Sequence, residues 1–293
     1  MTAPPLDRAT LVLDGGLSNQ LRAQGRALSD ELWTARLLTE EPEQLTAAHA
    51  AYVRAGARVV ITASYQASFE GFARRGIGRA AAARLFGDSV RLARRAGAEW
   101  VAASVGPYGA VLADGSEYRG RYGLSVGELA RFHRPRVAAL AAAGPDVLAL
   151  ETVPDVTEAE ALLRAVGDCG IPVWLSYTIA GDRTRAGQPL ADAFALAADE
   201  PGVVAVGVNC CDPGDVADAV ALAAEVTGKP VVAYPNSGEA WDPVARRWRG
   251  PVTYDPGAAV AWRAAGARLI GGCCRVGPGH IAAVAAALAV APG

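Results

Sequence analysis

"DVLALETVPDVTEAEALLRAVGDCGIPVWLSY", residues 146–177, contains one complete unit of the pattern that decides the fold. Asp146–Leu150 and Val173–Tyr177 are short runs that are apolar on both faces, as strands of a parallel sheet covered by helices must be. Glu158–Val166, between them, has the alanine- and leucine-rich pattern of an amphipathic helix. The stretch therefore predicts two parallel strands joined by a helix.

The same alternation occurs eight times along the chain. The other strand candidates are Leu11–Asp14, Arg58–Ala63, Trp100–Val105, Val203–Val208, Pro230–Tyr234 and Arg268–Gly271, and the other helical segments include Glu43–Ala55, Ala80–Ala96, Val126–Ala143 and Val216–Val226. Eight such units in about 250 residues are typical of a (β/α)8 TIM barrel of the α/β class. We expect a single barrel domain over residues 1–293, although an open doubly wound sheet has the same alternation. The long connection at residues 106–123 is expected to be functional.

Composition excludes several classes of function. The chain has 293 residues, 52% of them hydrophobic, and a formal net charge of −2, which argues against a nucleic-acid or anionic-membrane surface. No apolar run reaches the roughly 18 residues of a membrane span, and residues 1–16 lack the pattern of a signal peptide. The five cysteines are odd in number and unevenly placed, so we expect no disulfide framework and a reducing cytoplasm.

In a barrel, the chemistry lies at the carboxyl ends of the strands. The residues there are Asp14, Gly15, Gly16, Ser64, Tyr65, Gly106–Tyr108, Glu151, Thr152, Tyr177, Thr178, Asn209–Cys211, Pro235, Asn236 and Gly272–Arg275. Cys210 follows the sixth strand, and the adjacent Cys273 and Cys274 follow the eighth, so these three thiols open onto one face.

Three thiolates suit zinc, and three protein ligands leave the fourth tetrahedral position open, which is typical of a catalytic site. A closed four-cysteine site would also need Cys211, but adjacent residues leaving a strand tend to point in opposite directions. Unmetallated thiols, or a strained disulfide between Cys273 and Cys274, would also account for the cysteine pattern. Cys169 is expected to be a small packing residue.

A zinc ion with three thiolates carries a net charge of −1 and is a poor Lewis acid for activating water. A thiol that entered the fourth position would lose its proton and remain electron-rich, hence nucleophilic at neutral pH. The matching electrophile is a methyl group on a positively charged donor, because its attack neutralises charge.

Three motifs resemble those of the homocysteine S-methyltransferase family: "GVNCC" (207–211), "GGCCR" (271–275) and "LDGGLSNQL" (13–21). The resemblance covers nearly the whole chain. Five further stretches resemble the S-methylmethionine-using branch of the family in particular: "ITASYQAS" (61–68), "SVGPYGAVLADGSEYRGRYG" (104–123), "FHRPR" (132–136), "YPNSGE" (234–239) and "ARLIGGCCR" (267–275). The family resemblance implies a (β/α)8 barrel with zinc bound by Cys210, Cys273 and Cys274. It also implies that Cys211 is not a zinc ligand.

Homocysteine needs anchors for its ammonium and carboxylate groups. Glu151 is the expected ammonium partner, unless it caps the following helix instead. The resemblance implies that Asp14 lines the homocysteine site, unless it only forms a turn. The amides of Gly15 and Gly16 are candidates for the carboxylate. Ser64, Tyr65, Asn209 and Asn236 complete the expected substrate-binding set.

Aromatic faces attract a sulfonium ion, so the candidates for the donor side are Tyr65, Tyr108, Tyr118 and Tyr122, each of which could instead be a packing residue at the barrel rim. Arg119 and Arg121 are candidates for the donor carboxylate. None of His49, His133 and His280 is assigned to zinc, and no protein nucleophile or general base is required.

The sequence therefore predicts zinc-dependent methyl transfer from a sulfonium donor to L-homocysteine, forming methionine. S-methylmethionine is the expected donor and S-adenosylmethionine the alternative. A betaine- or selenocysteine-linked methyltransferase and a non-catalytic zinc or thiol sensor are also compatible with these motifs. A zinc hydrolase is disfavoured, because such sites use histidine and carboxylate ligands more often. Only small molecules are expected as partners, with no nucleic acid or membrane, and the chain is expected to be a cytoplasmic monomer.

Overall fold

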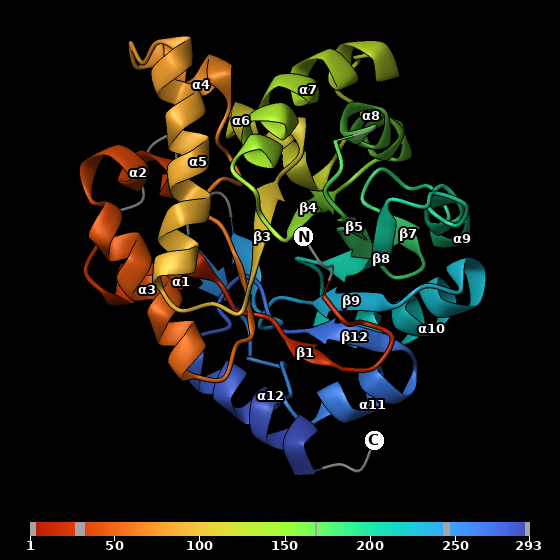
Figure 1. Cartoon of the computed structure of the whole chain (residues 1–293). Coiled ribbons are helices and arrows are strands. Elements are labelled where there is room, and N and C mark those ends of the chain that lie inside the picture. Colours follow the sequence, from red (N-terminus) through yellow and green to blue (C-terminus); the bar gives the residue numbers. More distant parts are fainter. Residues whose placement is uncertain (1–3, 27–32, 168, 243–246, 291–293) are drawn as a thin grey trace.

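The protein, seen here as a computed structural model, is built around eight parallel strands (Figure 1). The structure describes residues 4–26, 33–167, 169–242 and 247–290, so both ends of the expected 1–293 domain lie outside it. The strands are β1 (Leu11–Val12), β2 (Val59–Ile61), β3 (Trp100–Val105), β4 (Val147–Val153), β5 (Val173–Tyr177), β8 (Val203–Asn209), β9 (Val231–Tyr234) and β12 (Ala267–Ile270). They lie in the order β1-β12-β9-β8-β5-β4-β3-β2.

The sheet closes between its first and last strands. Leu13 forms a parallel bridge with Val59, and the Arg58 N–H donates to the Val12 carbonyl oxygen at 2.8 Å. Closure excludes the open doubly wound sheet and confirms the (β/α)8 barrel. All eight predicted strands are present, and the bounds of β3 and β5 agree with the prediction.

Helices surround the barrel (Figure 1). They are α1 (Leu17–Ala23), α2 (Leu37–Glu40), α3 (Pro42–Arg54), α4 (Phe69–Arg74), α5 (Arg79–Arg95), α6 (Tyr108–Leu112), α7 (Val126–Ala142), α8 (Val156–Val166), α9 (Leu190–Ala195), α10 (Val216–Thr227), α11 (Ala258–Ala264) and α12 (Pro278–Val290), with 3-10 turns η1 (Trp33–Arg36), η2 (Ser116–Tyr118) and η3 (Pro213–Asp215). The five predicted helices agree with α3, α5, α7, α8 and α10 to within a residue or two. Among the described residues, no helix is long and apolar enough to cross a membrane.

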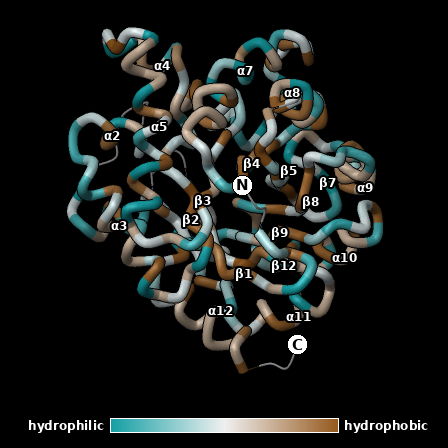
Figure 2. Tube along the Cα trace, viewed as in Figure 1, coloured by the Kyte–Doolittle hydropathy of each residue, from teal (hydrophilic) through white to brown (hydrophobic). Residues whose placement is uncertain are grey.

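The barrel separates two apolar cores, and the brown central strands of Figure 2 contribute to both. The interior core contains Leu6, Leu11, Leu13, Val59, Ala102, Val147, Ala149, Trp174, Ala205, Val232, Tyr234 and Leu269. The larger core lies between the strands and the helices. Because side chains alternate along a strand, the next inward-facing layer toward the carboxyl ends contains Ser104, Glu151, Ser176 and Asn209. The interior therefore changes from apolar to polar just below the expected site.

The long connection after β3 is folded. Residues 106–123 contain α6 and η2, and two carboxylates of the β4–α8 connection and α8 hold this segment. Glu158 accepts the Tyr108 N–H at 2.5 Å, and Asp155 accepts the Arg121 N–H at 2.9 Å. Tyr108 and Tyr122 pack together beside Leu129, with ring centroids 5.3 Å apart. We call residues 106–123 the docked segment.

Two hairpins that the sequence did not predict extend from the barrel. β6 (Ile179–Ala180) pairs with β7 (Arg183–Thr184) after β5, and β10 (Ala240–Asp242) pairs with β11 (Arg247–Arg249) after β9. Both lie in connections from the carboxyl ends of strands, the side on which the site is expected.

Candidate active site at the carboxyl ends of the strands

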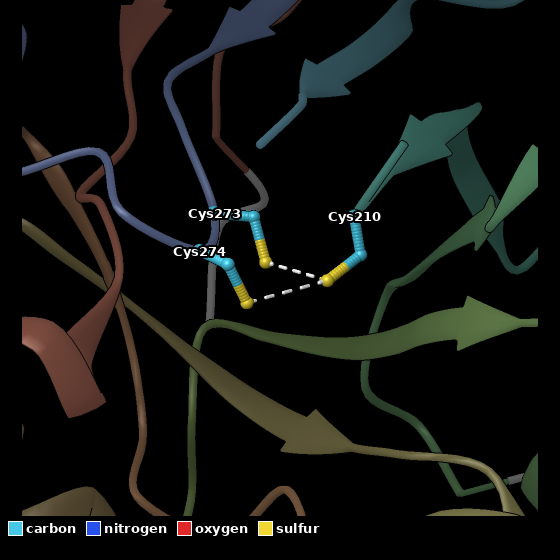
Figure 3. A group of neighbouring side chains, drawn as sticks. All are labelled: Cys210, Cys273 and Cys274. Carbon is cyan, nitrogen blue, oxygen red and sulfur yellow. Dashed lines mark hydrogen bonds between the residues drawn. The ribbon is translucent and has the colours of Figure 1, made fainter. Parts of the chain in front are cut away.

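Three thiols converge where β8 and β12 end (Figure 3). The Cys210 sulfur lies 3.0 Å from the Cys273 sulfur and 3.8 Å from the Cys274 sulfur, and all three lie within 4.8 Å of one another. Two thiolates on tetrahedral zinc, at bond lengths of about 2.3 Å, would be about 3.8 Å apart. The Cys210–Cys274 pair has that spacing already, and the Cys210–Cys273 pair would need to open by about 0.8 Å. Across the described residues, this is the one cysteine, histidine and carboxylate cluster compact enough for a metal.

Glycines and the β9 connection determine where the adjacent pair lies. A Cβ on Gly272 would lie 2.2 Å from a Val276 methyl carbon, so a side chain here would force the loop away. The Cys273 N–H donates to the Pro235 carbonyl oxygen at 2.7 Å, and the Cys274 N–H donates to the Asn236 Oδ1 at 3.1 Å. The loop after β12 is thus held against the end of β9.

The thiols also polarise one another. Hydrogen bonds from Cys210 and Cys273 hold the pKa of Cys274 well below its usual value. Hydrogen bonds to Cys210 and Cys274 favour the protonated Cys273 and raise its pKa. The shared hydrogen bonds therefore couple the titration of the three thiols.

The other cysteines and the histidines lie elsewhere. Cys211 is buried in the core between strands and helices, and Cys169 packs at the edge of that core, as expected for both. His49 is buried on α3, His133 pairs with Glu158 at 2.9 Å, and His280 lies at the start of α12. None belongs to the thiol cluster.

The backbone beside the cluster is strained. Thr152, Cys210 and Arg275 have φ angles of 57°, 52° and 68°, in the left-handed region that non-glycine residues rarely adopt. Between the pairs Leu150–Leu175 and Val153–Tyr177, β4 has one residue more than β5, which makes a bulge at 151–152. Strain of this kind is typical of functional sites, where the surrounding structure maintains it.

Asn209 maintains the conformation of Thr152. Its Oδ1 accepts the Thr152 N–H at 2.7 Å and the Ser176 hydroxyl at 2.8 Å, and its amide donates to the Thr152 hydroxyl at 2.7 Å. Asn209 is fully buried, so its contacts are those of a supporting residue rather than of the expected substrate-binding residue.

Glu151 lies on the polar floor below the thiols. It accepts hydrogen bonds from Ser104 and, at 3.0 Å, from Tyr234, which itself lies 3.1 Å from the Trp174 indole nitrogen. Burial raises the pKa of Glu151 to about 7, against the two hydrogen bonds, and Cys210 raises it further. The cap of α8 is Asp155, so a capping role for Glu151 is wrong.

Asp14 is a second buried carboxylate, 1% exposed. Its Oδ2 accepts the Ile61 N–H at 2.9 Å, and its buried Oδ1 accepts no hydrogen bond from the residues that the structure describes. Burial raises the pKa of Asp14 well above its usual value, and the charge of Glu151 raises it further. The two carboxylates are therefore close enough to repel, and a cation between them would relieve that repulsion.

Gly15 and Gly16 are required by close packing. A Cβ on Gly15 would lie 2.2 Å from the Val276 carbonyl oxygen, and one on Gly16 would lie 2.6 Å from the Cys273 carbonyl oxygen. The Gly16 N–H donates to the Val276 oxygen at 2.9 Å. This bond corrects the expectation for Gly16, because its amide is already engaged within the protein.

The remaining expected residues support the site. Ser64 donates to the Ser104 carbonyl oxygen at 2.8 Å, and Asn236 orients Cys274 by accepting its N–H. Tyr65 is half-buried and packs so closely on Gly106 that a Cβ there would lie 2.6 Å from its ring.

Four residues at the site were missed or left undecided by the sequence. Tyr118, one of several donor candidates, has its hydroxyl 3.4 Å from the Cys210 sulfur. Ser104 and Tyr234 contact Glu151, and strand alternation from Ala102 and Val232 could have found them. Glu117, beside Tyr118, had no signal in the sequence.

The fold and cluster define a barrel enzyme that can hold a soft metal through thiolates and a charged small molecule above buried carboxylates. A family model described as homocysteine S-methyltransferase matches residues 11–288. The chain belongs to this family, and its reaction is methyl transfer to homocysteine.

Relatives of the chain agree over nearly its full length. A homocysteine S-methyltransferase of Escherichia coli is 46% identical over 94% of both chains. One of Bacillus subtilis is 43% identical over 94% of this chain and 93% of the relative. The crystal structure of the metallated form of the E. coli homocysteine methyltransferase MmuM superposes with a TM-score of 0.86 at 44% identity, over 96% of this chain and 97% of that one.

Proposed function

We propose that the enzyme holds Zn²⁺ through Cys210, Cys273 and Cys274 and transfers a methyl group from S-methylmethionine to L-homocysteine, forming methionine. The observation that carries the proposal is the convergence of three thiols within 4.8 Å above a floor that contains Glu151. Thiolate ligands favour zinc among the common divalent ions. The resemblance of the docked segment to the S-methylmethionine-using branch supports the choice of donor.

Zinc, when bound, lowers the pKa of a thiol in its open fourth position, so that homocysteine presents a nucleophilic sulfur at neutral pH. The protein contributes the ligand geometry. Asn236 and the Pro235 carbonyl oxygen orient Cys274 and Cys273, and Asn209 keeps the strained backbone beside Cys210 in place. The loss of the thiol proton on binding makes a general base unnecessary.

Glu151 and Asp14 bind the ammonium group of homocysteine in this proposal. The ammonium offsets the repulsion between the two carboxylates. It also donates a hydrogen bond to Asp14 Oδ1, which accepts none from the described residues. Hydrogen bonds from Tyr234 and Ser104 favour the ionised form of Glu151 that the ammonium requires, against the effect of burial. The Gly15 amide remains the candidate for the substrate carboxylate.

The test is to supply purified, zinc-loaded protein with homocysteine and one donor at a time: S-methylmethionine, S-adenosylmethionine or betaine. Methionine formation should be fastest with S-methylmethionine. A faster reaction with either other donor would overturn the donor assignment. Full activity after zinc removal would overturn the proposed requirement for zinc. Replacing homocysteine by selenocysteine tests the acceptor.

A further inference from the structure

Glu117 lies in η2 of the docked segment, next to Tyr118, and has no part in the binding of zinc or homocysteine. It is partly buried, and its Oε2 is shielded from solvent and accepts no hydrogen bond from any residue that the structure describes. A shielded carboxylate oxygen without a hydrogen-bond partner is destabilising, and more so if it is charged. The Glu117 Oε2 is therefore available to accept a hydrogen bond from a ligand or to contact a cation.

Glu117 faces the thiol cluster. Its charge acts on Cys210 and Cys274, and it is the largest charge contribution to the raised pKa of Tyr65. Tyr118, its neighbour, has its hydroxyl 3.4 Å from the Cys210 sulfur while 38% of the residue is exposed. Glu117 and Tyr118 thus lie at the part of the docked segment that is next to the sulfurs, with Tyr65 near them.

The position of Glu117 is fixed before any substrate binds. A Cβ on Gly109 would lie 2.5 Å from the Glu117 backbone nitrogen, so α6 and η2 are in direct backbone contact. Asp114 accepts the Ser116 N–H at 2.9 Å, and Asp155 holds the segment beyond η2 through the Arg121 N–H. The backbone of Glu117 is consequently held in place by the fold.

Like charges surround this carboxylate. Burial, together with the charges of Cys210 and Asp114, raises the pKa of Glu117 to about 7. Three thiolates on zinc would leave a net charge of −1, so the metal does not remove the repulsion. A cation that binds between Glu117 and the sulfurs would remove it, and the faces of Tyr65 and Tyr118 would add cation–π attraction.

We propose that Glu117 binds the positively charged sulfonium of the methyl donor, with Tyr65 and Tyr118 beside it, and thereby selects cationic donors. The inference rests on the proposed function. The homocysteine sulfur forms the new bond to the methyl carbon, the donor's sulfur–methyl bond breaks, and its electron pair stays on the donor sulfur, which becomes a neutral thioether. Glu117 forms no covalent bond, and the charge that it recognises disappears in the reaction, which favours release of the demethylated donor.

The first measurement is equilibrium binding of S-methylmethionine by calorimetry without homocysteine, so that no acceptor is present. Glu117→Gln should weaken binding by about ten- to a hundredfold, as expected for loss of a contact to a charged group. Glu160→Gln, an exposed glutamate on α8 that does not contact the docked segment, is the matched control and should bind like the wild type. Equal affinity in Glu117→Gln and the wild type would overturn the inference, whether or not methyl transfer is observed.

The second measurement separates recognition of charge from a general effect on the site. Wild type and Glu117→Gln are compared with S-methylmethionine and with a neutral methyl sulfonate ester as donors to homocysteine. The variant should lose kcat/KM about ten- to a hundredfold with the cationic donor and less than about twofold with the neutral one. Equal losses with both donors would overturn the inference. Absence of methyl transfer by the wild type from every cationic donor would instead overturn the proposed function, and the calorimetry would still decide the role of Glu117.

Discussion

At the scale of single residues, the site combines three sulfurs with three carboxyl groups whose pKa values are raised by burial. Burial raises the pKa values of both Glu151 and Glu117 to about 7, and Asp14 is shifted in the same direction. Each of these carboxyl groups is destabilised when it is ionised without a counter-ion. Amino-acid and sulfonium substrates supply positive charges, so substrate binding stabilises the charged carboxylates that the empty site disfavours.

This coupling predicts a pH dependence for the homocysteine site. Methionine is the suitable probe, because it has the amino-acid group but no thiol proton to lose. The pKa of Glu151 is about 7 in the free protein, so below that pH the ammonium must displace a proton. Methionine affinity should therefore be highest near pH 8, where Glu151 is ionised and the methionine ammonium is still protonated, and should weaken, toward tenfold per unit, below about pH 6.

Glu151→Gln should weaken methionine binding about ten- to a hundredfold at pH 8 and should abolish the pH dependence near pH 7. Glu160→Gln, an exposed glutamate on α8, is the control and should keep the wild-type profile. Calorimetric titrations at several pH values provide the measurement. A Glu151→Gln profile that matches the wild type would assign the titration to another group.

Metal content tests the ligand set. Cys210→Ala, Cys273→Ala and Cys274→Ala should each lose the zinc, because two thiolates with no third ligand bind it far more weakly. Cys211→Ala and Cys169→Ala should each retain one zinc per chain, since both side chains pack in the core. Elemental analysis of the five purified variants decides this, and a zinc-free Cys211→Ala would contradict the assignment.

The sequence predicted the site unevenly. The cysteines and Glu151 could be identified because they directly follow strands, where barrels carry their chemistry. Ser104 and Tyr234 were missed because they lie within the predicted strands, although alternation from the apolar residues Ala102 and Val232 places them on the same inward face. The outcome for the Gly16 amide depended on its hydrogen bond with Val276, which is distant in sequence.

At the scale of elements, the docked segment was predicted as a functional loop, but α6 and η2 within it were not. Each is too short to be stable alone. Contacts with Asp155, Glu158 and the α7–α8 surface determine their structure, and such contacts leave no local pattern in the sequence. The strands and long helices, in contrast, were predictable because periodic burial determines them.

Asp155→Ala should release the docked segment and also remove the cap of α8, because one carboxylate accepts both the Arg121 and Thr157 N–H groups. Amide exchange in residues 116–122 should become faster, and the KM for the donor should rise several-fold, with homocysteine binding unchanged. Ser125→Ala removes only the cap of α7 and should destabilise the protein by about 1 kcal/mol without changing KM. Unchanged exchange in Asp155→Ala would mean that tyrosine packing alone holds the segment.

At the scale of the whole molecule, barrel closure depends on close approach of backbones. A Cβ on Gly207 would lie 1.9 Å from the Val232 carbonyl oxygen, where β8 pairs with β9. Gly207→Ala should therefore lower the free energy of unfolding by about 1–3 kcal/mol or more. Gly202→Ala, at the start of the same strand with no atom within 4 Å of its new Cβ, should be neutral or slightly stabilising. Thermal unfolding compares the stabilities of the two variants. Equal stability would show that β8 and β9 can move apart to accommodate the new methyl group at position 207.

The insertion of β12 between β9 and β1 determines when during synthesis the three thiols can first come together. A chain emerging from the ribosome presents Cys210 long before Cys273 and Cys274, and β12 must insert between β9 and β1 before the adjacent pair meets its partner. The Gly16 N–H and the Tyr52 hydroxyl then join the first loop to the last one through the Val276 carbonyl oxygen. Nascent chains that stop before β12 therefore contain one thiol of the three, so the ligand set proposed for zinc is complete only in molecules that have passed β12.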